Sequence, residues 1–489
     1  MRSSGILMPV FSLPSPYGIG TFGKAAFDFI NFLRDSGQSY WQILPLGPTG
    51  FGDSPYQSFS SFAGNPYFID LDLLAEEKLL LKEEIPAYDF NDNKIDYEKL
   101  YYNRYPLLKK AFSRFVPNDA YNSFVCDNAN WLNAYALFMA LKSAFGGAPW
   151  YKWDTPLIKR EADAVKDAQT KYIDEIDFQY FLQFKFYEQW SQLKNYANEN
   201  GIKIIGDIPI YVALDSADVW ADPKQFQLDQ DYTPRAVAGV PPDAFSDDGQ
   251  LWGNPLYDWD YMKSTNYAWW KNYLRYALKR YDVVRIDHFR AFESYFSIPF
   301  GDKDAKRGKW VKGPDKALFD AFADEFGNNL PIIAEDLGVI TPAVRKLLDY
   351  TKFPGMKVLQ FAFSGNSDNA YLPHNIVKNC VIYTGTHDND TIIGWLETEN
   401  ADVVKQAKDY LNYQNDNGFN WAMIKAAMSS VADTCIIPMA DFLGADSTAR
   451  INTPSTLGSN WSWQIDGGCI NSWLAGIIRE NTELYGREC

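Results

Sequence analysis

Short apolar runs alternate with amphipathic helices along most of this chain of 489 residues, and no other feature restricts its fold as strongly. Near-continuous apolar strands are buried on both faces, as happens in a parallel sheet covered by helices. Segment 24–33, with apolar residues at helical spacing, is typical of the helices between them. The strand candidates are 40–46, the weak 67–71, 202–208, 282–287, 331–335, 356–363, 381–386 and 435–439. Eight strands of this kind predict an α/β fold, a (β/α)₈ barrel of the TIM type.

Two segments interrupt the alternation and predict insertions into a single catalytic domain, 1–489. Segment 73–177 is rich in Lys, Glu, Tyr and Phe at helical spacing, so we expect a mostly helical insertion. Segment 212–260 contains glycine- and proline-rich stretches, and a loop of this length within a compact domain is usually functional. We therefore expect a second insertion there, with 239–254 as an active-site loop. The short stretch after 435–439 predicts no C-terminal β domain.

Charge and cysteine usage exclude several kinds of partner. The chain has 46 Lys and Arg against 62 Asp and Glu, a net charge of −16. We expect no nucleic-acid partner and no membrane partner, because a nucleic acid and an anionic bilayer both need a basic face, and no apolar run has the ~18 residues of a membrane helix. Five separated cysteines form no disulfide framework and the first residues are a poor signal peptide, which together favour a cytoplasmic protein.

The sequence supports neither a nucleotide site nor a histidine-based metal site. Segment 18–23 (GIGTFG) matches the dinucleotide pattern G-x-G-x-x-G, but Pro14 and Pro16 stand where the preceding strand is needed. The chain has only three histidines, so a histidine-based metal cluster is not expected. We expect no cofactor and no metal ion.

The first of three acidic strand ends is 282–290 (DVVRIDHFR). Alternation along a strand puts Arg285 and Asp287 on one face and Val284 and Ile286 on the other. A guanidinium beside a carboxylate favours its ionised form, which suits a nucleophile. An Arg–Asp ion pair without chemistry is the alternative interpretation.

The second and third acidic strand ends are 331–338 (PIIAEDLG) and 381–391 (VIYTGTHDNDT). Glu335 and Asp336 face opposite sides, so one of them points at a substrate, or one caps the helix that begins near Thr341. A glutamate in a semi-apolar site near another carboxylate has a raised pKa and can donate a proton. The pair His387 and Asp388 fits hydrogen bonding to sugar hydroxyls; Mg²⁺ binding by Asp388-x-Asp390 and helix capping are the alternatives.

The three acids fall on the fourth, fifth and seventh strands if 202–208 is the third. Barrel enzymes place catalysis at the C-terminal ends of several strands. A carboxylate nucleophile together with a carboxylic acid/base predicts a retaining glycosidase mechanism. Phe, Tyr and Trp make up 16% of the chain, and aromatic faces pack well against sugars.

At this point the motifs of the chain resemble those of the 4-α-glucanotransferases (amylomaltase, or disproportionating enzyme), relatives of the α-amylase barrel enzymes. The resemblance runs from Gly5 to about Trp463. It is carried by 18–20 (GIG), 52–58 (GDSPYQS), 206–212 (GDIPIYV), 284–290 (VRIDHFR), 334–338 (AEDLG) and 384–391 (TGTHDNDT).

The resemblance implies a role for each matching residue. Asp287 would be the nucleophile, Glu335 the general acid/base and Asp388 the transition-state stabiliser, with help from Arg285 and His387. Sugar contacts are implied for Ser54, Tyr56, Asp207, Trp252, Asp336 and Asn460. Two positions depart from the family pattern: Ser455, where glycine is usual, and Gln464, where a basic residue is usual.

The implied reaction moves a segment of an α-1,4-glucan to the 4-hydroxyl of glucose or a maltooligosaccharide through a covalent glucosyl-enzyme. We expect these sugars as partners of a monomer or weak homo-oligomer. Our hypothesis is that loop 239–254 covers the cleft with Phe245 and Trp252 and gives the acceptor an apolar surface, the alternative being that Trp252 only anchors the loop. An α-1,4-glucan hydrolase and a non-catalytic glucan-binding protein remain as rival functions.

Overall fold

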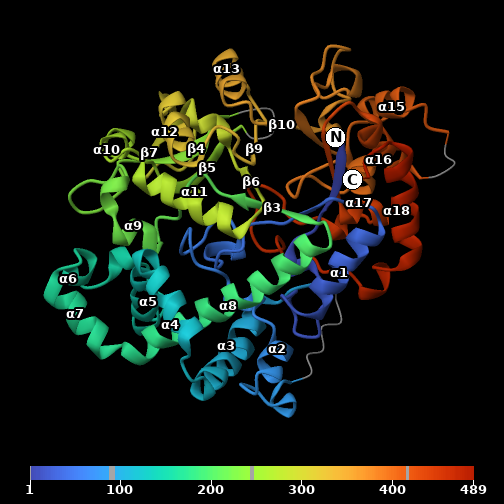
Figure 1. Cartoon of the computed structure of the whole chain (residues 1–489). Helices are drawn as coiled ribbons and strands as arrows, with labels where there is room; N and C mark the ends of the chain where they lie inside the picture. Colours follow the sequence, from blue (N-terminus) through green and yellow to red (C-terminus); the bar gives the residue numbers. More distant parts are fainter. Residues whose placement is uncertain (1, 87–93, 243–246, 415–417, 489) are drawn as a thin grey trace.

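The computed structural model describes residues 2–86, 94–242, 247–414 and 418–488. Eight parallel strands form one sheet in the order β10-β11-β12-β1-β2-β3-β6-β9, and helices surround it (Figure 1). The strands are β1 (Ser3–Leu7), β2 (Tyr40–Gln42), β3 (Lys203–Ile208), β6 (Val283–Ile286), β9 (Ile332–Ala334), β10 (Gly355–Val358), β11 (Cys380–Tyr383) and β12 (Thr434–Pro438). The predicted (β/α)₈ barrel is confirmed.

One strand of the barrel was missed and one was predicted wrongly. The first strand is β1, which pairs with β12 and with β2, although its sequence SSGIL has too few apolar residues to signal a strand. Segment 67–71 is not a strand: Asn65 accepts a hydrogen bond from Tyr67 N and starts a short 3₁₀ helix, and Asp70 then caps α2 (Leu71–Glu76). Both errors lie before residue 202, and they leave the number of strands before it unchanged. Segment 202–208 therefore does hold the third strand.

The barrel closes between β9 and β10 through a side chain as well as the backbone. Ala334 N donates to Pro354 O at 3.0 Å. Two residues further on, Met356 N donates to Asp336 Oδ1 at 2.6 Å. A Cβ at Gly355 would lie 2.7 Å from both Asp336 carboxylate oxygens. Glycine at this position therefore makes room for the carboxylate that joins the two strands.

Most of the outer helices pack against the strand ladder through apolar faces. α1 (Lys24–Asp35) follows β1 and buries Phe29, Ile30 and Leu33. Gly23, the last glycine of 18–23, comes just before α1, and a Cβ there would overlap the carboxylate of Asp70. The same carboxylate accepts a hydrogen bond from Thr21 Oγ1 at 2.6 Å. The later outer helices are α11 (Ala268–Arg280), α12 (Lys316–Phe326), α13 (Pro342–Thr351), α14 (Ile392–Thr398), α15 (Ala401–Tyr410), α16 (Phe419–Ser429), α17 (Met439–Leu443) and α18 (Ser472–Leu484).

A group of helices lies between β2 and β3 and extends to one side of the barrel (Figure 1). Its longest member, α8 (Ile173–Glu199), returns to the barrel and is tied to the preceding chain where Gln183 bonds Gly64 N and O and Gln189 bonds Asp70 N and O. The others are α3 (Tyr97–Arg114), α4 (Asp119–Asp127), α5 (Ala129–Ala144), α6 (Thr155–Ile158) and α7 (Ala162–Lys171). The division of the chain into one domain with insertions 73–177 and 212–260 stays a prediction.

Segment 212–260 contains regular structure rather than only a loop. After α9 (Ala217–Ala221) come β4 (Ala236–Val240) and β5 (Gln250–Pro255), and α10 (Trp259–Ser264) follows. β4 and β5 join β7 (Ser294–Pro299) and β8 (Lys309–Lys312) in a four-stranded antiparallel sheet of order β5-β4-β7-β8. The described part of loop 239–254 thus belongs largely to β4 and β5, and Phe245 lies outside the described residues.

Three findings bear on partners and on the ends of the described chain. No helix among the described residues is long and apolar enough to cross a membrane. Cys126, Cys380, Cys435 and Cys469 are free. The two ends of the chain lie side by side (Figure 1), where Arg487 donates to Ser3 O at 2.9 Å.

Candidate active site

Three carboxylates stand at the C-terminal end of the barrel. Asp287 directly follows β6, Glu335 directly follows β9, and Asp388 comes shortly after β11. These are the fourth, fifth and seventh strands of the barrel, counted from β1. Because parallel strands end on the same side, the topology brings acids that are far apart in sequence to one mouth.

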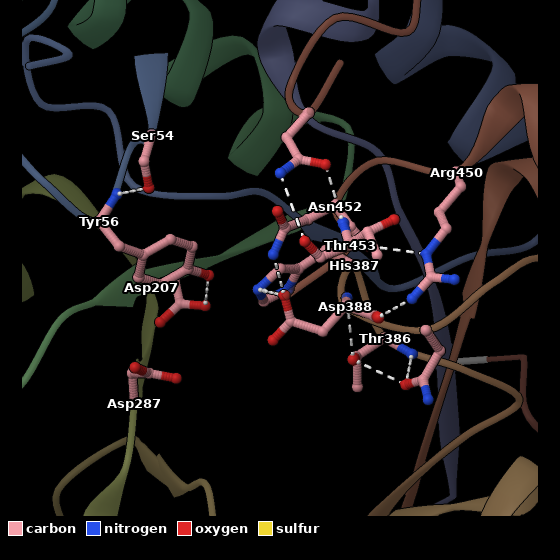
Figure 2. A network of polar contacts seen from close by, with 12 residues as sticks. Ser54, Tyr56, Asp207, Asp287, Thr386, His387, Asp388, Arg450, Asn452 and Thr453 are labelled. Atoms are coloured by element: carbon pink, nitrogen blue, oxygen red, sulfur yellow. Dashed lines mark hydrogen bonds and ion pairs between the residues drawn. The ribbon is translucent and has the colours of Figure 1, made fainter. Parts of the chain in front are cut away.

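A buried arginine joins two of the acidic residues. Arg285 and Asp287 share a strand face, and Arg285 Nη1 lies 3.1 Å from Asp287 Oδ1 and 2.5 Å from Asp207 Oδ2. Tyr56 donates its hydroxyl to the same Asp207 oxygen at 2.9 Å (Figure 2). Arg285 and Asp207 are almost completely buried, whereas the Asp287 side chain is 30% exposed. Asp287 is therefore the member of this group that a substrate can reach.

Two backbone amides hold the carboxylate of Glu335. His288 N donates to Oε2 at 2.7 Å and Leu337 N donates to Oε1 at 2.6 Å. The first contact depends on a left-handed turn at His288, with φ of 51°, directly after Asp287. The alternative that Glu335 or Asp336 caps the next helix is wrong, because Thr341 accepts from Val344 N at the start of α13.

Burial and neighbouring charges shift the pKa values of Asp287 and Glu335. Burial raises the pKa of Asp287, Arg285 opposes that rise, and the neighbouring charge of Glu335 adds to it. Burial also raises the pKa of Glu335, whereas Arg285 and the two backbone hydrogen bonds lower it. The charge of Glu335 opposes ionisation of Asp287, so the two carboxyls titrate as a coupled pair. Arg285 lies against Asp287, and this contact favours the ionised form of that carboxyl.

Burial favours the neutral form of the two histidines beside the acids. Burial lowers the pKa of His288 to about 3, and burial also lowers the pKa of His387 despite the nearby charge of Asp388. His387 stacks on Tyr56, with ring centroids 5.2 Å apart, and its Nε2 lies 3.4 Å from Asp388 Oδ1. A neutral imidazole there can donate one hydrogen bond and fix the carboxylate.

Asp388 is held by a segment near the end of the chain. Asn452 Nδ2 donates to its Oδ1 at 2.6 Å, and Arg450 donates to its backbone oxygen at 2.9 Å (Figure 2). Capping is done by Thr391, which accepts from Gly394 N at the start of α14. Asp390 Oδ2 instead accepts a hydrogen bond from Ser447. Within the described ranges, no group of three or more Asp, Glu, His or Cys residues could hold a metal ion.

A cleft of about 350 Å³ opens over Asp287 and Asp388. Of the residues predicted for the site, it is lined by Ser54, Tyr56, Trp252, Asp287, His387, Asp388 and Asn460. Four other described residues of the predicted site do not line it: Asp207 and Arg285 lie beside Tyr56, Glu335 beside His288, and Asp336 in the seam between β9 and β10.

The comparisons with known proteins agree with this geometry. The family model described as 4-alpha-glucanotransferase matches residues 8–469. The chain belongs to the 4-α-glucanotransferase family. Its activity is 4-α-glucan transfer.

Two bacterial relatives match over nearly their whole length. A 4-alpha-glucanotransferase from Clostridium butyricum is 49% identical over 98% of this chain and 100% of its own, and one from Thermus thermophilus is 47% identical over 99% of both chains. An amylomaltase from Streptococcus agalactiae, solved in complex with acarbose, superposes with a TM-score of 0.97 at 40% identity over 100% of both chains.

The two departures from the family pattern have different settings. Ser455 lines the cleft with φ of 64°, a left-handed conformation that glycine adopts without strain. Gln464 is buried and donates to Leu13 O at 3.1 Å, so it joins the end of the chain to the start of the barrel. The first departure alters a wall of the cleft, and the second lies away from the acids.

Several residues around the cleft were not predicted from the sequence. Asn452, Arg450 and Trp461 lie after the last barrel strand, in a polar segment with no strand end to draw attention to it. Asn460, predicted to contact sugar, uses its amide inside this segment, accepting from Thr453 N at 2.9 Å and donating to Thr456 O at 3.0 Å. The only sequence signal was the concentration of Asn, Thr and Trp in 450–463.

Proposed function

We propose that this 4-α-glucanotransferase acts by a retaining double displacement in which Asp287 is the nucleophile, Glu335 the general acid/base and Asp388 the stabiliser of the transition state. The single observation that carries the proposal is the Arg285–Asp287–Glu335 arrangement, because it brings a carboxylate paired with a cation and a second carboxyl with a raised pKa to the same mouth. A retaining mechanism needs one ionised carboxylate as nucleophile and one protonated carboxyl as acid.

In the first step Asp287 attacks the anomeric carbon of an α-1,4-glucan, and Glu335 gives its proton to the leaving glycosidic oxygen. In the second step Glu335 takes the proton of an acceptor 4-hydroxyl, which attacks the glucosyl-enzyme and releases Asp287. Asp388 binds ring hydroxyls most tightly when the ring is distorted towards the oxocarbenium-like state.

The substrates we propose are α-1,4-glucans and maltooligosaccharides, with glucose as an acceptor. The acarbose complex of the Streptococcus agalactiae amylomaltase supports this substrate class. Tyr56, Trp252 and Trp461 give the cleft aromatic faces suited to sugar rings. Trp252 also contacts His288 edge to face, with ring centroids 4.9 Å apart, which puts it next to the residue that clamps Glu335.

We propose further that the protein works in the cytoplasm, as a monomer or weak homo-oligomer. Its free cysteines, two of them buried on neighbouring strands, suit a reducing compartment. The net charge of −16 favours neutral sugars over nucleic acid or an anionic membrane.

Incubation with maltotriose tests the proposed reaction. We expect glucose together with a ladder of longer maltooligosaccharides, at a constant number of reducing ends. A rising number of reducing ends would identify a hydrolase, and binding without any product would identify a sugar-binding protein.

A further inference from the structure

Segment 450–461 reaches the proposed transition-state acid with one side-chain amide. Asn452 Nδ2 donates to Asp388 Oδ1 at 2.6 Å, a short bond of the charge-assisted kind (Figure 2). The other oxygen, Oδ2, has no hydrogen-bond partner among the described residues, and the Asp388 side chain is 44% exposed and lines the cleft. One carboxylate oxygen is therefore fixed by the protein and the other is open to a ligand.

The backbone around Asn452 is fixed on both sides of the contact. Asn452 N donates to His387 O at 3.1 Å, and Arg450 Nε donates to Asn452 O at 2.9 Å. The same guanidinium donates to Asp388 O at 2.9 Å and has Asp390 as its counter-charge at 3.7 Å. These bonds join the segment directly to the turn that carries Asp388.

The rest of the segment is closed by its own hydrogen bonds. Trp461 N donates to Ile451 O at 2.7 Å, and the amide of Asn460 bridges Thr453 and Thr456. The ring of Trp461 packs near Tyr56 and His387, with centroids 5.8 and 6.1 Å away. The position of the Asn452 amide is thus determined before any sugar binds.

We propose that Asn452 is a positioning residue for Asp388, and that Arg450 fixes the backbone through which it acts. The inference rests on the proposed role of Asp388. By holding Oδ1, the amide directs Oδ2 at the sugar hydroxyls, so the carboxylate does not have to reorient as the ring distorts. Interactions arranged in advance in this way lower the barrier of the chemical step more than they tighten ground-state binding.

The test uses Asn452→Ala and Asn452→Asp, assayed by glucose release from maltotriose. Loss of a hydrogen bond to a charged group predicts a kcat lower by about 10- to 100-fold, with KM for maltotriose changed by less than about threefold. Arg450→Lys is expected to give a smaller fall in kcat. Asn379→Asp is the matched control, because its amide donates to Lys352 O at 3.1 Å, away from the cleft.

The pH profile of Asn452→Asp separates positioning from a structural role. The introduced carboxylate repels Asp388 when both are ionised, but one shared proton at low pH restores a donor to Oδ1. The groups near this pair are His387, Arg450, Asp287, Asp390 and the Tyr56 hydroxyl. Activity relative to the parent, measured at each pH, should therefore rise as the pH falls for Asn452→Asp and stay flat for Asn452→Ala.

Two results would overturn the inference. The first is a kcat unchanged in both Asn452 variants; the second is an equal loss at every pH that follows a lowered melting temperature. Asp388→Asn distinguishes this failure from failure of the proposed function: if that variant keeps full activity, the role of Asp388 itself is wrong.

Discussion

The ion pair of Arg285 and Asp287 makes a quantitative prediction about the pH dependence of transfer. The charge of Arg285 lowers the pKa of Asp287 against the effect of burial, so its removal should raise that pKa. Because the nucleophile reacts as an anion, the acidic limb of kcat/KM should move to higher pH. The 3.1 Å contact corresponds to about 5 kcal/mol at an effective dielectric constant of about 20.

The full contact energy equals about four pH units, at about 1.4 kcal/mol for each. The expected shift is smaller, about two units, since Asp287 is partly exposed and water replaces some of the lost contact.

The perturbation must avoid leaving Asp207 charged and unpaired, because breaking a buried pair costs about 3–5 kcal/mol of stability. We therefore compare Asp207→Asn with Asp207→Asn/Arg285→Met, measuring kcat/KM for maltotriose across the pH range in which both remain folded. Arg285→Lys, which keeps the charge, should move the limb least. An acidic limb at the same pH in the single and double variants would refute the view that Arg285 keeps the nucleophile ionised.

Three further predictions follow from individual contacts. Gly355→Ala should destabilise the protein by about 1–3 kcal/mol in urea, because the new Cβ would lie 2.7 Å from the Asp336 oxygens that join β9 and β10; Gly476→Ala, with nothing within 4 Å, is the control, and equal effects would contradict the account of the seam. Trp252→Ala should raise the ratio of hydrolysis to transfer, seen as extra reducing ends from maltotriose, whereas Leu251→Ala on the same strand should leave it unchanged; a constant ratio in Trp252→Ala would mean that Trp252 only anchors the hairpin. Asp287→Asn should lose nearly all transfer while its circular dichroism spectrum is preserved, and turnover in that variant would show that another residue is the nucleophile.

The barrel could be predicted because its strands are apolar on both faces. Where that signal is weak, the prediction failed: β1 carries two serines and a glycine, and its pairing with β2 and β12 makes it a strand. The strands β7 and β8 were not predicted either, since β7 comes shortly after the turn at Asp287 and His288 and β8 is largely exposed. Pairing between distant segments decides such strands, and a local pattern does not record it.

The acids could be predicted because each follows an apolar strand, and strand ends share one mouth. The sequence could not show that Asp336 closes the barrel seam or that Asn460 closes its own segment, because both functions depend on partners in the folded chain. Asn452 was missed for the same reason: nothing local links it to Asp388, which is 64 positions earlier.

In the proposed mechanism Asp287 forms a covalent bond to the donor sugar. The most direct measurement is the intact mass of the Glu335→Ala variant mixed with α-maltotriosyl fluoride, a donor whose leaving group needs no protonation, followed by peptide mapping. Without its base the variant cannot pass the sugar on rapidly, so we predict one maltotriosyl adduct per chain, located on Asp287 and absent from Asp287→Asn/Glu335→Ala. An adduct on a different residue, or fluoride release with no adduct at any time, would contradict the mechanism.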